Sequence, residues 1–187
     1  MFEWLRSLQP NDWLQLVSII ASIAAIFISN WIGRREALRK EKYKQRLNRY
    51  NNFYVPFIKF FFIHTPHEYL FFLILLDGSF SELDSLIKNN LQYLNSDSAK
   101  KYYYLCNKAH DIDSLAKVAR EKILSGNFKA GEPIVNFTQT EINAYSAFND
   151  FALSALQESV CLAQELGLEP IGQSVLEIYS DELHRPK

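Results

Sequence analysis

An uncharged apolar stretch near the N-terminus, residues 13–32, constrains the fold of this chain more than any other feature. Twenty residues in an α-helix rise about 30 Å, which is the thickness of the hydrocarbon core of a bilayer. Trp13 and Trp31 lie near the two ends of the stretch, where the indole ring prefers the boundary with the headgroups. We therefore expect a transmembrane helix over residues 13–32, preceded by a short outer arm, residues 1–12. The alternatives are a buried helix of a soluble protein and a cleaved signal peptide, but a signal peptide usually carries its positive charges before the apolar stretch.

A dense basic run follows the apolar stretch at once. It sets eight basic residues against two glutamates, and the eight are Arg34, Arg35, Arg39, Lys40, Lys42, Lys44, Arg46 and Arg49. Because Lys and Arg beside a membrane helix stay on the cytoplasmic side, we expect a single-pass protein of the plasma membrane with its N-terminus outside and the remainder cytoplasmic. We also expect these eight residues to contact the anionic headgroups of the bilayer. Nucleic-acid binding is the other common interpretation of such a run, but topology and lipid contact explain it here, so we expect no nucleic-acid partner.

The polar and small residues inside the apolar stretch are not scattered. They recur at spacings of three, four, three and four, and they are Gln15, Ser18, Ser22, Ala25 and Ser29. In a helix this spacing places them on one face, where small side chains allow close approach in lipid and Gln and Ser can hydrogen-bond across the contact. The pattern predicts a membrane-helix association face, with a second copy or another helical protein as the partner. The alternative is that Ser and Ala are merely tolerated there.

The basic stalk, residues 33–56, carries an aromatic stripe that extends a little beyond it. The stripe recurs at spacings of four and three and comprises Tyr43, Leu47, Tyr50, Tyr54, Phe57 and Phe61. This is the spacing of a packing seam, either in a coiled coil or along a helical bundle, and tyrosines suit a seam against other helices. Pro56 lies inside the stripe and removes a backbone donor, so we expect the helix to kink or end near Tyr54.

The remaining residues, 57–187, are expected to form a cytoplasmic antiparallel helical bundle, which makes the chain all-α. Three T/S-x-x-E capping boxes mark helix starts at Thr65, Ser79 and Thr138, and no segment shows clear strand alternation. Residues 57–76 are apolar enough to suggest a second or re-entrant membrane segment. Lys59 and the histidines that follow interrupt the segment, so a buried helical corner is the preferred interpretation.

Two clusters invite a chemical interpretation. The segment His64-Thr65-Pro66-His67-Glu68 matches no known zinc-binding order, and its capping box accounts for most of it, so we expect no metal site there. The doublet His110-Asp111 loosely resembles that of the HD phosphohydrolases, which are all helical. The resemblance implies an earlier metal ligand, for which His64 or His67 could serve, and a later one, for which Asp150 could serve. It covers two residues, and Ile112 and Asp113 follow where that family often has glycine and lysine.

The sequence contains no phosphate-binding loop, dinucleotide-binding motif or nucleophile elbow, and we expect neither a catalytic site nor a cofactor. The function expected from these features is a membrane-tethered helical interaction or assembly module. An alternative is a membrane-acting effector of the toxin or phage-defence type that oligomerises through the transmembrane helix. The HD-like metal-dependent phosphohydrolase is a minor third alternative.

Overall fold

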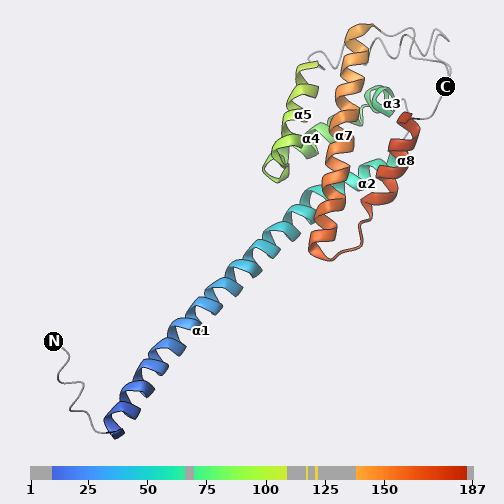
Figure 1. Ribbon diagram of the computed structural model, residues 1–187. Coiled ribbons are helices and arrows are strands. Elements are labelled where there is room, and N and C mark those ends of the chain that lie inside the picture. The colour runs from blue at the N-terminus through green and yellow to red at the C-terminus, as the bar shows by residue number, and fades with distance from the viewer. Residues whose placement is uncertain (1–9, 66–69, 109–116, 118–120, 122–137, 185–187) are drawn as a thin grey trace. The chain divides into compact units, whose positions relative to one another are not determined.

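The computed structural model describes residues 10–65, 70–108, 117, 121 and 138–184, and over these residues it is all-α and contains no strand (Figure 1). The elements are α1 (Pro10–Arg49), the π-helical turn η2 (Tyr50–Tyr54), α2 (Val55–Ile63), α3 (Leu70–Asp77), α4 (Phe80–Asn89), the 3-10 turn η3 (Leu91–Tyr93), α5 (Ser96–Lys108), α7 (Gln139–Leu166) and α8 (Gly172–His184). The chain divides into two compact units, Met1–Gln45 and Arg46–Lys187. The second unit therefore begins at Arg46, whereas the sequence placed the start of the bundle at residue 57.

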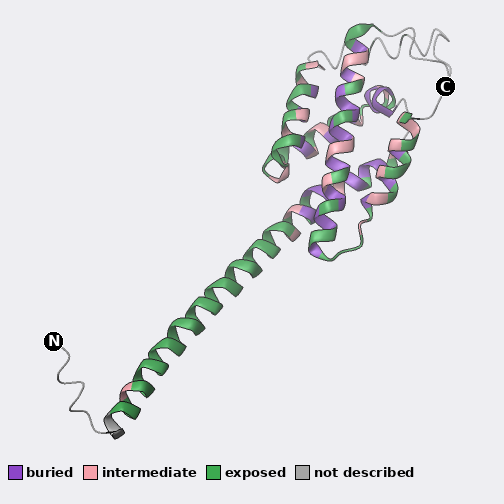
Figure 2. Cartoon of the chain, viewed as in Figure 1, coloured by how far each residue is buried: buried purple, intermediate pink, exposed green. Residues whose placement is uncertain are grey.

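The described part of the first unit consists of α1 alone. Apart from Leu16, which is intermediate, its large apolar side chains are exposed along the apolar stretch, as the mostly green ribbon in Figure 2 shows. The continuous helix Trp13–Ile63 is the one described helix that is long and apolar enough to cross a membrane, and none of its most apolar window is buried. The expected span, residues 13–32, lies within this helix. An apolar helix whose side chains are not buried by the rest of its unit is typical of a membrane-spanning segment.

Pro56 does not end the helix. Instead the chain passes through the π-helical turn η2, in which the Val55 N–H bonds to the Tyr50 carbonyl, and continues as α2 with proline in the first turn. A proline in a regular α-helix clashes with the carbonyl four residues earlier and leaves it without a donor. The wider π turn makes room for the ring. The predicted break is therefore a local change of helix type, and the chain remains helical through it.

The core of the second unit is built around α7. This helix contacts α3, α5, α8 and η2, and both α5 and α8 run antiparallel to it (Figure 1). Aromatic rings join the N-terminal elements to the C-terminal ones: Phe57 packs against Phe151 with ring centroids 5.9 Å apart, and Phe71 packs against Phe148 at 5.0 Å. Most apolar side chains of α2 and α3 are thus buried in the core of the second unit. Of residues 57–76, the structure describes 57–65 and 70–76, which lie mainly in α2 and α3, and among the described residues it contains no second helix long and apolar enough to cross a membrane.

The sequence signals for helix ends were right at some positions and wrong at one. The capping box at Thr138 is confirmed, since its hydroxyl oxygen accepts from the Glu141 N–H at 3.4 Å and the Glu141 carboxylate accepts from the Thr138 N–H at 2.5 Å. Glycines with positive φ follow α3 and α7, at Gly78 and Gly167. The box predicted at Ser79 is wrong, because the Ser79 side chain caps nothing and its N–H bonds to the Asp77 carboxylate at 2.8 Å. The box predicted at Thr65 lies partly outside the described residues.

Candidate functional site

The predicted association face lies on the exposed surface of α1. Its five members are exposed or nearly so, and they are Gln15, Ser18, Ser22, Ala25 and Ser29. The Ser22 hydroxyl donates to the Ser18 carbonyl at 2.8 Å, so it is satisfied within its own helix. This internal bond removes the cost of placing a hydroxyl in lipid. It also means that Ser22 does not require a second helix as a hydrogen-bond partner.

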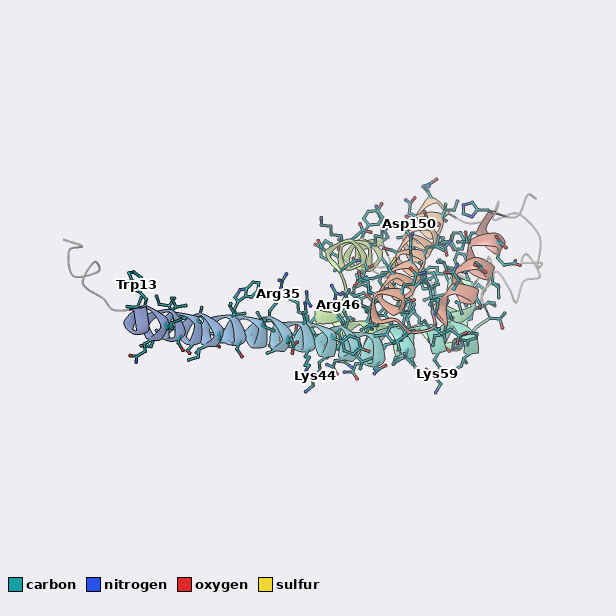
Figure 3. All side chains as sticks on the ribbon, turned by 60° about the horizontal axis from the view of Figure 1, so that its bottom comes forward. Trp13, Arg35, Lys44, Arg46, Lys59 and Asp150 are labelled. Atoms are coloured by element: carbon teal, nitrogen blue, oxygen red, sulfur yellow. The ribbon has the colours of Figure 1, made fainter. Side chains whose placement is uncertain are left out.

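Six of the eight basic residues belong to the first unit and are exposed there: Arg34, Arg35, Arg39, Lys40, Lys42 and Lys44. Among the described residues no ion pair involves any of them. The Arg35 guanidinium lies 5.3 Å from the centroid of the Trp31 ring, one helical turn earlier, and Figure 3 shows Arg35 and Lys44 projecting from the helix. Within the part of the chain that the structure describes, these six side chains present unpaired positive charge immediately after the apolar stretch.

The other two basic residues have partners within the second unit. Arg46 pairs with Glu165 on α7, with Nη1 and Oε2 3.2 Å apart, and Arg49 pairs with Glu158 on the same helix. The two pairs differ in burial. The side chains of Arg46 and Glu165 are 52% and 53% exposed, whereas those of Arg49 and Glu158 are 28% and 10% exposed. Headgroup contact stays a prediction for all eight basic residues, and the structure adds that Arg46 and Arg49 already have carboxylate partners in the second unit.

Arg49 is the centre of a polar cluster that sequence reasoning missed. Its Nε donates to the Tyr93 carbonyl, its Nη2 donates to the Tyr54 hydroxyl at 3.1 Å, and its guanidinium lies 5.5 Å from the centroid of the Tyr54 ring. Burial raises the pKa of Tyr54 well above its usual value, while the Arg49 charge opposes that rise. On the other side of the cluster the Glu158 carboxylate accepts from the Ser98 hydroxyl at 3.1 Å. Arg49 therefore links the end of α1 to η2, η3 and α7, and its partner Glu158 extends the cluster to α5.

A cavity of about 390 Å³ opens beside this cluster, between α5 and α7. Its wall includes Arg49, Asp97, Glu158, Cys161 and Glu165. The charged groups of the wall are already compensated, since Arg49 and Glu158 pair with each other, Asp97 lies 2.7 Å from the Lys101 ammonium, and Glu165 pairs with Arg46. The cavity is thus lined by side chains of these ion pairs, and these charged groups are all compensated by a partner.

The aromatic stripe of the stalk enters the core of the second unit. Tyr50, Tyr54, Phe57 and Phe61 are buried, and Leu47 is partly buried against them. Phe61 packs against Tyr179 of α8 with ring centroids 5.6 Å apart. Tyr43, in the first unit, is exposed. Of the two interpretations left open for the seam, packing along the bundle describes its buried members, and the residues that would form a coiled-coil surface are already occupied.

The candidate metal ligands are only partly within the described residues. His67, His110 and Asp111 lie outside them. His64 Nδ1 lies 3.8 Å from the Asp77 carboxylate, and Asp150 is exposed on α7 (Figure 3). Among the residues that the structure describes, no group of three or more His, Cys, Asp or Glu side chains could hold a metal ion.

No protein-family model matches this chain, and neither a curated protein nor a solved structure matches it.

Proposed function

We propose that this chain is a membrane-tethered helical interaction or assembly module. The observation that carries the proposal is the uncovered apolar part of the helix Trp13–Ile63, followed in the chain by a second unit with a dense aromatic core. In water, each Å² of exposed apolar surface is unfavourable by roughly 25 cal/mol. In a bilayer the same surface stabilises insertion, and the helix satisfies its backbone internally.

The exposed basic residues favour one orientation and one lipid class. Arg34 and Arg35 follow Ile32 by two and three residues, about 3–5 Å of helix, so they lie within a headgroup layer about 5–8 Å thick. The other four exposed cations of the first unit follow at increasing distance, up to about 18 Å at Lys44. Each Lys or Arg near an anionic leaflet contributes about 1 kcal/mol of attraction at physiological ionic strength. The proposal therefore places residues 46–187 in the cytoplasm, beneath a plasma membrane rich in anionic lipid.

A topology experiment tests this proposal. A reporter fused after Lys187 should be active as a cytoplasmic fusion and silent as an exported one, because Lys and Arg after the span remain inside. Replacing Arg34, Arg35, Arg39 and Lys40 together by Glu should weaken or invert that orientation. A reporter that is exported from the unaltered chain, or a chain that alkaline washing removes from membranes, would contradict the tether.

A vesicle leakage assay distinguishes the proposed tether from the alternative, a membrane-acting effector. A tether leaves the bilayer sealed, whereas an effector that oligomerises through the helix releases a dye trapped in vesicles. Purified chain inserted into vesicles of phosphatidylcholine and phosphatidylglycerol should therefore cause no more leakage than a single-span control peptide. Sustained dye release that disappears with Ser22→Leu would favour the effector instead, because the added bulk blocks close approach at that face.

A further inference from the structure

The corner formed by α2 and α3 leaves apolar side chains uncovered. Phe62 is 60% exposed, Ile63 is 65% exposed and Leu73 is 42% exposed. Both helices are apolar on nearly every face, and a helix of that kind is normally covered all round. Single exposed apolar residues are common, but neighbouring ones mark a surface that another molecule covers. We name Phe62 and Ile63 the knob of this surface.

An apolar cavity of about 490 Å³ lies beside the knob. Its lining includes Leu70, Leu73, Ile74 and Leu76 of α3, together with His64, which follows the knob directly in the chain. A cavity of about 150 Å³ with aliphatic walls is enough to bind benzene. The cavity therefore has room for both side chains of a knob. The chain's own knob does not fill it, since Phe62 and Ile63 remain exposed and are absent from its lining.

Two charges of opposite sign flank the knob and the cavity. Lys59 is exposed one helical turn before Ile63 and projects outward from α2 (Figure 3). Asp77 lies one turn after Leu73, with its carboxylate half exposed at the wall of the cavity, where it also accepts from the Ser79 N–H at 2.8 Å and lies 3.8 Å from His64 Nδ1. In a two-fold contact residue i of one copy meets residue j of the other, and j meets i. A surface that carries a knob with a positive charge and a cavity with a negative charge is complementary to itself under that symmetry.

We infer that this surface binds a second copy of the chain, the knob of each copy entering the cavity of the other and Lys59 facing the other copy's Asp77. The inference rests on the proposed tether, which confines every copy to the same face of one bilayer. The few exposed side chains involved fall short of the roughly 1,200 Å² that a standard stable interface buries, so the contact is weak in solution. Confinement to a bilayer raises the effective concentration and makes it appreciable.

Disulfide trapping of the full-length chain in vesicles tests the contact. Cys106 and Cys161 are first replaced by Ser. Ile63→Cys and Leu73→Cys are then introduced into separate chains, which are mixed, reconstituted together and exposed to mild copper-catalysed oxidation. The matched control pairs the Ile63→Cys chain with a Tyr103→Cys chain, because Tyr103 lies on α5 at a position that is 68% exposed.

The mixture of Ile63→Cys with Leu73→Cys should give about fivefold more linked dimer than the control mixture. Dilution into detergent should remove the excess, because it abolishes the confinement that raises the effective concentration. Adding Lys59→Glu to both chains should lower the yield in vesicles, because it replaces the attraction to the other copy's Asp77 by repulsion.

The outcomes separate this inference from the proposed function. If the chain resists alkaline washing but the two mixtures link equally, the tether stands and the inferred contact is wrong. If alkaline washing extracts the chain, the tether fails, and the contact that depends on it fails too. If brominated lipids quench a fluorophore attached to the new thiol of the Ile63→Cys chain, the bilayer covers the knob and the second copy does not. Thermal unfolding of each variant, compared with the cysteine-free parent, shows that the fold is intact.

Discussion

The ion pair between Arg49 and Glu158 yields the sharpest prediction. Glu158→Gln removes one charge from a pair whose side chains are largely buried and keeps an oxygen that the Ser98 hydroxyl can donate to. Glu165→Gln makes the same chemical change seven residues later on the same helix, in a pair whose two side chains are about half exposed. The two sites therefore differ in burial and in the hydrogen bonds that Glu158 accepts from the Ser98 hydroxyl and the Asn95 N–H, both of which a glutamine oxygen can keep.

The magnitudes follow from that difference. Removing one partner of a fully buried ion pair costs about 3–5 kcal/mol, and removing one partner of an exposed pair costs about 0–1 kcal/mol. Arg49 keeps some solvent contact, the Tyr93 carbonyl and the Tyr54 hydroxyl, so we expect Glu158→Gln to lower the free energy of unfolding by about 2–3 kcal/mol. For a unit of this size that is a fall in Tm of roughly 6–12 °C. Glu165→Gln should change Tm by less than about 3 °C.

The assay is thermal and urea unfolding of the full chain in mild detergent, followed by far-UV circular dichroism. The membrane helix stays helical in the micelle and contributes a constant background. Arg49→Met should cost a similar amount, and the two losses should not add in the double variant, because the residues share one interaction. Equal losses for the two glutamine variants, or additive losses at Arg49 and Glu158, would refute the reasoning.

Three further predictions concern the second unit. Gly172→Ala places a Cβ 2.6 Å from a hydroxyl oxygen on α7 and should lower the free energy of unfolding by about 1–3 kcal/mol in urea titrations. Tyr179→Phe deletes a buried bond of 2.5 Å to Asn149 and should cost about 1–3 kcal/mol by the same assay. A hydrogen bond from Lys101 lowers the pKa of Asp97, so the stability that the Asp97 carboxylate contributes is present near neutrality and is lost as the pH falls through that lowered pKa. In urea titrations Asp97→Asn should therefore have a lower free energy of unfolding than wild type at neutral pH and the same one in strong acid.

Structural features that depend on residues close together in the chain were predictable from the sequence. The apolar stretch with its basic flank indicated the exposed helix, and the residues from Thr138 to Glu141 indicated the start of α7, because both signals act within a few residues of one another. The Ser79 motif has the same pattern but does not form a capping box, because Asp77, two residues earlier, accepts from the Ser79 N–H that the Glu82 carboxylate would otherwise bond. A competing side chain just outside a motif was enough to defeat it.

The role of Arg49 could not be read from the sequence. Locally it is one more cation in a basic run, and its partner Glu158 is more than a hundred residues away in the chain. What distinguishes it from Arg39 or Lys42 is burial, which depends on where α7 packs. Pro56 is a related case, since the rule that proline disrupts an α-helix is correct, but the rule does not say whether the helix ends or widens into a π turn.

The aromatic contacts between α2 and α7 bear on how the chain is made. Phe57 has no Phe151 ring to pack against until ninety-four further residues have been synthesised. At about 5–20 residues per second a ribosome takes roughly 5–20 s to cover that distance. Throughout that interval the phenylalanines of α2 and α3 lack the helix that covers them, while the apolar stretch before them has already been synthesised. Slowing or speeding translation between residues 77 and 139 should therefore change how much of the nascent chain is captured by chaperones, although the finished protein is identical.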